Sequence, residues 1–246
     1  MLSKKTAPLL AGKFYHIFNR TNNSEILFRE DKNKRYFLNK YQQHLGSFLR
    51  TYAYCLLGNH FHFLVQVKYE EELLATLLNT PIHLRSKIQH DFIEILKAEG
   101  AFKKIPLEAL QELPPKRFPF LEESYQFGPL VSAQFQRLFS GYSKAFNKRY
   151  NRQGNLFNRP FKRVQVQDED HFTTLIYYIH ANAMLHGIEK DFKQNLWSSY
   201  STLISNQPTF VEREAVMDWF GGKKQLMEFH GDKHDLKGIQ KLIIEN

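Results

Sequence analysis

Two short apolar runs that follow each other closely set the strongest limit on how this chain can fold. Residues 49–57 and 61–68 are rich in aromatic and β-branched side chains, and the turn-forming pair Gly58 and Asn59 lies between them. Such runs separated by a glycine-containing turn predict two antiparallel strands of a β-hairpin. The sequence therefore predicts a sheet that contains this hairpin.

The segments on either side of the hairpin predict further strands and several helices. Residues 106–120, which contain four prolines, are typical of a loop-rich insertion. Strands are expected at 13–20 and 160–166, and helices around 36–45, 70–80, 84–99, 135–146, 168–185 and 213–220. This order predicts an α+β fold in which helices pack on an antiparallel sheet.

Most of the formal net charge of +9 comes from one segment. Residues 124–167 contain eight Lys and Arg side chains, nine aromatic rings and no Asp or Glu. Four of the rings recur at spacings of 4, 3 and 4, which predicts the buried stripe of an amphipathic helix. They are Phe135, Phe139, Tyr142 and Phe146. The cations lie mostly off this stripe, so we expect a phosphate-binding surface, with an ordinary solvated face as the plainer alternative.

The single cysteine and the lack of a long apolar run limit the cellular setting. Cys55 has no partner for an internal disulfide, which favours a reducing, cytoplasmic setting, and its apolar surroundings place it in the core. No run of about 18 apolar residues occurs, so we expect neither a signal peptide nor a membrane helix. Nucleic acid and a membrane surface would both suit the charge. We favour nucleic acid, because no basic amphipathic helix is set apart by a linker.

Two histidines lie close together in the second strand of the hairpin. Side chains alternate between the two faces of a strand, so His60 and His62 share one face, about 7 Å apart at Cα. Imidazoles placed in this way can bind one cation, although a pair of histidines on a strand is more commonly structural. A metal site would require a third ligand.

The helix expected at 168–185 offers such a ligand. Tyr178 lies about 120° from the apolar stripe of this helix, and Asn182 lies one turn further along on the same face. By themselves they fit a helix edge and a solvated amide. Beside His60 and His62 they would supply a nucleophile and an oxygen ligand for a divalent cation.

These motifs resemble a known family. Residues 58–65 resemble the HUH motif, and residues 178–182 resemble the catalytic helix of single-tyrosine HUH transposases, most closely the REP-associated tyrosine transposase group. Residues 15–23, 154–163 and 197–200 agree with the same group in order and spacing. The resemblance covers about residues 11–200.

The resemblance implies a fold and a division of the chain. It implies a ferredoxin-like or RRM-like antiparallel sheet with helices on its faces, in a domain at 1–200. A helical and loop insertion is expected at about 69–128, and a C-terminal extension at 201–246. The chain departs from the family at Ala183, where a proline usually follows the asparagine, and this change can lengthen the helix.

The resemblance also implies a reaction. Tyr178 would attack a backbone phosphorus of single-stranded DNA, giving a 5′-phosphotyrosine and a free 3′-hydroxyl. A phenol ordinarily titrates near 10 and needs activation near neutral pH. Mg²⁺ or Mn²⁺ held by His60, His62 and Asn182 would bind a phosphate oxygen and stabilise the developing charge. The family cuts and rejoins strands without ATP.

The implied partner is a single-stranded DNA hairpin of the repeat palindromic kind, bound in the nucleoid by a monomer with a complete site or by a homodimer. His16 and His180 are nearby titratable groups that could relay protons or contact DNA, or simply pack. The residues expected to bind DNA are Arg20, Asn23, Lys144, Lys148, Arg149, Arg152, Arg159, Lys162 and Arg163.

Two alternatives belong to other functional classes. A domesticated protein could bind hairpins without cutting them, but binding alone does not require all four of Tyr178, His60, His62 and Asn182. A replication-initiation HUH nuclease usually carries additional domains such as a helicase, and none is visible in this sequence.

Overall fold

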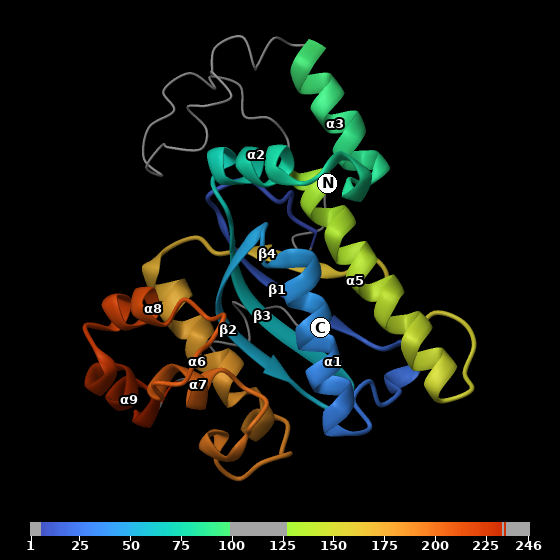
Figure 1. Ribbon diagram of the computed structural model, residues 1–246. Coiled ribbons are helices and arrows are strands. Elements are labelled where there is room, and N and C mark those ends of the chain that lie inside the picture. The colour runs from blue at the N-terminus through green and yellow to red at the C-terminus, as the bar shows by residue number, and fades with distance from the viewer. Residues whose placement is uncertain (1–5, 99–126, 233, 235–246) are drawn as a thin grey trace.

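The computed structural model describes residues 6–98, 127–232 and 234, and it has one four-stranded sheet with helices on both faces (Figure 1). The predicted insertion at 106–120 lies outside the described residues. The strands are β1 (Phe14–Arg20), β2 (Leu49–Leu56), β3 (His60–Val67) and β4 (Lys162–Gln165). The helices are α1 (Asp31–Leu45), α2 (Glu70–Asn79), α3 (Lys87–Ala98), α5 (Gly128–Arg149), α6 (Glu169–Leu185), α7 (Tyr200–Ile204), α8 (Arg213–Phe220) and α9 (Lys223–Gly231). Short 3₁₀ turns are η1 (Asn22–Ser24), η2 (Ile82–Leu84) and η4 (Phe192–Gln194).

The sheet has the order β2-β3-β1-β4, and every neighbouring pair is antiparallel. The predicted hairpin is β2 and β3, joined through Gly58 and Asn59. The prediction of an α+β fold with helices on an antiparallel sheet is confirmed. The last strand is shorter than the predicted 160–166, because only four of its residues pair with β1.

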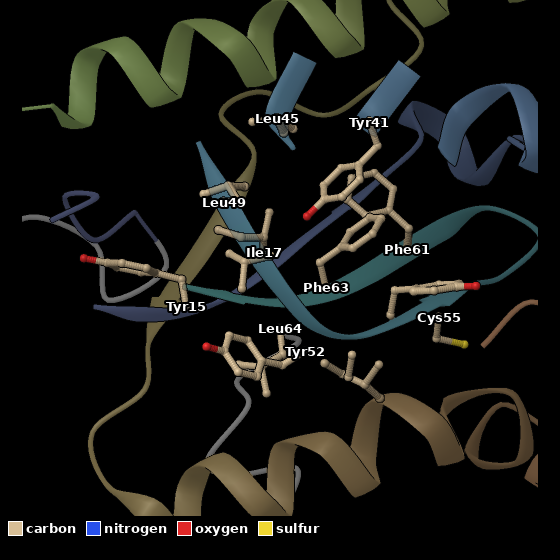
Figure 2. Packing of buried hydrophobic residues seen from close by; sticks show 14 of the residues in the cluster. Tyr15, Ile17, Tyr41, Leu45, Leu49, Tyr52, Cys55, Phe61, Phe63 and Leu64 are labelled. Carbon is tan, nitrogen blue, oxygen red and sulfur yellow. The ribbon is translucent and has the colours of Figure 1, made fainter. Parts of the chain in front are cut away.

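The two faces of the sheet are covered by different helices. Phe63 of β3 stacks on Tyr41 of α1 with ring centroids 4.2 Å apart, which places α1 on one face. On the other face Tyr52 of β2 meets Phe172 of α6, with centroids 5.4 Å apart. Figure 2 shows Tyr41 and Phe63 on one side of the strands, with Tyr52 and Leu64 on the other. Alternation along β3 therefore turns its phenylalanines toward α1 and its histidines toward α6.

Helix α5 packs on the α1 side, as the spacing of its aromatic residues predicts. All four rings of the predicted stripe are buried, and the Tyr142 hydroxyl donates a hydrogen bond to the Leu27 carbonyl. Pro129 in the first turn fits a helix start, where its missing N–H has no helical partner. Since the stripe is buried, these rings belong to the core and do not serve as stacking platforms.

Helix α6 begins as predicted and runs past Ala183. The Asp168 carboxylate accepts a hydrogen bond from the His171 N–H, which caps the helix. Residues 175–183 are all buried, so the helix is covered around its whole circumference and not only along its apolar stripe. The cover comes from the C-terminal segment, including helix α9, which the sequence analysis did not predict. Cys55 is fully buried in β2, as expected.

The C-terminal segment also contacts the sheet and is continuous with the core. Glu212 N donates to the Thr51 carbonyl of β2, and Phe210 stacks on Tyr54 with centroids 5.5 Å apart. Helix α8 ends at Gly221, whose φ of 79° is the left-handed conformation that glycine favours. No helix in the described ranges is long and apolar enough to cross a membrane.

Candidate active site and nucleic-acid interface

Strand β3 and helix α6 bring the four predicted site residues together. The Nε2 atom of His60 lies 3.2 Å from the Oδ1 atom of Asn182, although 122 positions separate them in the sequence. The Tyr178 ring meets the His62 ring edge to face, with centroids 5.8 Å apart. The two imidazole rings are themselves 5.1 Å apart. The structure therefore places these four side chains beside one another, on one face of β3 and one face of α6.

The hydrogen bonds of His60 decide what its second nitrogen can do. Its Nδ1 atom lies 2.6 Å from Oδ1 of Asn59, and its Nε2 atom lies 3.2 Å from Oδ1 of Asn182. A neutral imidazole carries one N–H, so it donates to one of these oxygens and keeps a lone pair on its other nitrogen. A proton on Nδ1 leaves the lone pair of Nε2 for a cation, whereas a proton on Nε2 makes the contact with Asn182 an ordinary hydrogen bond. Asn182 is fully buried, and its Nδ2 has no hydrogen-bond partner among the described residues.

His62 is held in a neutral state that suits metal binding. Its Nδ1 atom lies 2.9 Å from Nε2 of His16, and both rings are almost completely buried. Burial, together with the neighbouring positive charges of His60, His186 and Arg20, holds the pKa of His62 well below its usual range. If His62 donates from Nδ1, its Nε2 atom is an acceptor, and His16 is the outer partner that commonly orients a metal-binding imidazole. The sequence analysis named His16 without giving it this role.

The donor set fits a divalent cation of intermediate hardness. Ligands of an octahedral Mg²⁺ or Mn²⁺ lie about 2.1 Å from the ion, so neighbouring ligands lie about 3 Å apart. The 3.2 Å between His60 Nε2 and Asn182 Oδ1 matches that spacing. The described residues contain no group of three or more His, Cys, Asp or Glu side chains that could hold a metal. Two imidazoles and one amide oxygen would therefore be the protein ligands, a set that suits Mn²⁺ better than Mg²⁺.

One further histidine reaches the site from the end of α6. His186 follows Asn182 by four positions and is exposed, and its ring lies 4.9 Å from that of His60, edge to face. Its place depends on Ala183, because the helix continues through the position where the family usually has a proline. The sequence analysis missed His186, although Tyr178, Asn182 and His186 are spaced four apart and so share one helix face.

A groove of about 760 Å³ lies between α5 and the segment 154–163. Its walls carry serine, asparagine and glutamine side chains together with three cations and no acid. Among the described residues, Lys144 and Arg159 form no ion pair, and both are exposed. The lining residues are Ser132, Gln136, Phe139, Ser140, Ser143, Lys144, Asn147, Gly154, Asn155, Leu156, Phe157, Asn158, Arg159, Pro160, Phe161 and Arg163.

Three of the predicted DNA-binding cations have internal partners. Arg149 forms an ion pair with Glu30, and Arg152 forms a two-pronged one with Glu25, at 2.6 Å in each case. Arg152 also donates to the carbonyls of residues 153, 154 and 155, so it fixes the turn after α5. Arg163 lines the groove, but its Nε donates to the Ala7 carbonyl.

The remaining predicted contacts lie around the same region. Lys148 is exposed on the last turn of α5, and Lys162 is half-buried in β4. Arg20 ends β1 opposite His60, and Asn23 is exposed in the turn that follows. The backbone N–H of Asn158 donates to the Arg20 carbonyl, so the groove segment is joined to the strand that ends beside the site.

Comparisons with known proteins add one similar structure. No protein-family model matches this chain, and no curated protein matches it. A solved structure described as a REP-associated tyrosine transposase bound to a REP hairpin is similar, with a TM-score of 0.48 and 12% sequence identity. The match covers 90% of this chain and 98% of that one.

Proposed function

We propose that this protein is a metal-dependent transposase that cuts and rejoins single-stranded DNA at hairpins through a covalent tyrosine intermediate. The observation that carries the proposal is the meeting of His60 Nε2 and Asn182 Oδ1 at 3.2 Å, beside His62 and Tyr178. With the His60 proton on Nδ1, the Nε2 lone pair and the Asn182 oxygen would bind one cation together.

The proposed reaction is a transesterification at phosphorus. The Tyr178 oxygen bonds to phosphorus as the bond to the 3′ oxygen breaks, the phenol gives up its proton, and the leaving 3′ oxygen gains one. The product is a phosphotyrosine on the 5′ side and a free 3′-hydroxyl, so the reverse step needs no ATP. When bound, a divalent cation supplies charge stabilisation at a phosphate oxygen.

The chain's own residues hold and orient the reacting groups. His16 lies within hydrogen-bond distance of His62, and Asn59 within hydrogen-bond distance of His60, so each can orient the imidazole beside it. Burial of Tyr178 and Asn182 between the sheet and the C-terminal segment limits the directions in which α6 can shift. Positioning of this kind is a large part of catalysis, because small displacements of a nucleophile slow the reaction strongly.

The groove between α5 and residues 154–163 is the proposed cradle for the DNA strand. Lys144 and Arg159 are positioned to bind phosphates, and the serine and asparagine side chains can contact sugars or bases. The groove segment is hydrogen-bonded to the end of β1, which pairs with His60. A strand lying in the groove could therefore continue toward the histidine pair.

The decisive experiment uses an end-labelled single-stranded hairpin library and a denaturing gel. Wild type and Tyr178→Phe are incubated with Mn²⁺ or with EDTA, and cleavage and protein-linked DNA are scored. We expect metal-dependent cleavage with a covalent adduct, and loss of both in Tyr178→Phe. Tyr177→Phe is the matched control, because the neighbouring ring contacts α9 and not the histidine pair.

The other outcomes point to different functions. Binding of hairpins without cleavage or linkage, with any metal, would support a DNA-binding protein that does not cut. Failure to bind hairpins at all would remove the substrate assignment.

The groove has a separate test in the salt dependence of binding. Lys144→Ala should weaken hairpin binding about fourfold at physiological salt and reduce the slope of log K against log salt by about 0.7, the value for one phosphate contact on a single strand. Lys224→Ala, at an exposed position on α9, is the control and should change neither. Equal effects of the two changes would mean that the groove holds no phosphate.

A further inference from the structure

A second chain of histidine contacts lies on another side of helix α6. His180 Nδ1 is 2.8 Å from Nε2 of His230 in α9, and His180 Nε2 is 2.8 Å from the Ser199 hydroxyl. His230 Nδ1 is in turn 2.8 Å from the Leu226 carbonyl. The chain therefore joins α9, α6 and the start of α7 through side chains.

The carbonyl at one end fixes the direction of every hydrogen bond. A carbonyl only accepts, so His230 donates from Nδ1 and its neutral ring accepts at Nε2. His180 then donates from Nδ1 to His230 and accepts at Nε2 from the Ser199 hydroxyl. Ser199 Oγ also accepts from the backbone N–H of Tyr54 in β2, at 2.9 Å. Each nitrogen of the two imidazole rings therefore has a hydrogen-bond partner in the protein.

The side chains that make these hydrogen bonds lie in the interior of the protein. Ser199 and His180 are completely buried, and His230 is 2% exposed. The hydrogen bonds of Ser199, His180 and His230 therefore connect β2 of the sheet to α9 through α6, and we call these three side chains the tie.

The tie acts on the stretch of α6 that carries the proposed site. His180 lies between Tyr178 and Asn182, two positions from each, so any movement of its backbone moves theirs. The contact between α6 and α9 is extended by Tyr177, whose ring lies 5.7 Å from that of His230 and 6.4 Å from that of Phe229. Figure 1 shows α8 and α9 beside α6 and α7, away from α5.

We infer that α9 is a brace for helix α6, and that His230 is a positioning residue which sets the distance of Tyr178 and Asn182 from the histidine pair on β3. The inference gives the C-terminal segment a role in the site, and its effect on catalysis rests on the proposed function. It expects two separable effects: α6 loosens when the tie is broken, and the cation site weakens as a consequence.

The test compares two replacements of similar size. His230→Leu removes the acceptor for His180, whereas His230→Gln keeps an acceptor oxygen at the same place. Leu77→Ala, at a buried position of α2, a helix that lies away from α9 in Figure 1, is a control for general loss of stability. For each full-length protein we would measure hydrogen exchange of the amides of residues 176–183, Mn²⁺ affinity by calorimetry, and hairpin binding in EDTA.

We expect His230→Leu to speed exchange in residues 176–183 at least tenfold beyond its effect on the rest of the fold, and to weaken Mn²⁺ binding about tenfold. His230→Gln should recover most of both, and hairpin binding in EDTA should change less than twofold. Two results would contradict the inference. The first is that exchange in residues 176–183 rises no more in His230→Leu than in Leu77→Ala. The second is that His230→Gln exchanges these amides as fast as His230→Leu.

Failure of the proposed function would have a different signature. Wild-type protein would then bind no Mn²⁺, while the exchange data would still decide whether His230 holds α6.

Discussion

Helix α6 has histidine contacts on two sides. The sheet set contains His60 and His62 of β3, and the α9 set contains His180 and His230. The two sets differ in their hydrogen bonds. Toward α9, hydrogen bonds run from Ser199 through His180 and His230 to a backbone carbonyl, so each donor has an acceptor. Toward the sheet, His60 lies between the amide oxygens of Asn59 and Asn182, and a neutral imidazole can donate to only one of them.

This difference in hydrogen bonding distinguishes the structural histidines from the candidate functional ones better than burial does. Both sets are largely buried, and burial lowers the pKa of His62, His180 and His230 alike. The α9 set is complete without any added group. In the sheet set a cation can take the place of the hydrogen bond between His60 and Asn182, which is why we propose the metal there.

Removal of a proposed ligand should have the largest effect. His62→Ala leaves one imidazole and one amide, so we expect Mn²⁺ affinity to fall at least about 300-fold, more than 3 kcal/mol in binding free energy. Isothermal titration calorimetry measures it directly. His44→Ala, which removes a half-buried histidine from α1, should leave the affinity unchanged. Equal affinities for the two variants would contradict the assignment of the metal to the sheet side.

The α9 set should respond to pH rather than to metal. Burial lowers the pKa of His230 to about 4. An ordinary histidine titrates near 6.5, so the unfolded chain binds more protons than the folded protein between these values, and stability falls as the pH drops from 6.5 to 4. His230 alone should account for about 3 kcal/mol at pH 4.

Urea unfolding in EDTA between pH 7 and pH 4 measures this loss. His230→Gln has no imidazole at this position, so its stability curve should be flatter by the same amount. A wild-type curve no steeper than that of the Gln variant would show that His230 is not held neutral.

A smaller effect should sharpen the contrast on the sheet side. Asn182→Asp replaces an amide oxygen by a carboxylate, which hard divalent cations prefer. We expect about tenfold tighter Mn²⁺ binding, or about 1.4 kcal/mol, and a larger relative gain for Mg²⁺. A weaker Mn²⁺ complex in the Asp variant would show that Asn182 does not face the ion.

Much of the fold could be predicted because local patterns and packing agree. Alternation along residues 61–67 placed His60 and His62 on one face, and the spacing of Phe135, Phe139, Tyr142 and Phe146 identified the buried face of α5. These patterns predict burial correctly because the face on which a residue lies depends only on the periodicity of its own helix or strand.

What the sequence did not predict depends on contacts between distant segments. Helix α9 has no strong apolar period, and its partner His180 lies 50 positions away. Ion pairs such as Arg152 with Glu25 join segments 127 positions apart, so a basic run cannot show which cations are already engaged. His186 required knowing that α6 continues past Ala183.

The origin of the four site residues has a consequence for mixtures of variants. His60 and His62 come from β3, Tyr178 and Asn182 come from α6, and α6 packs on the sheet of its own chain. Two inactive copies, one lacking the tyrosine and the other lacking a histidine, would therefore fail to complement each other. We expect turnover to rise in proportion to the first power of protein concentration, as it does for a site built from the residues of one chain.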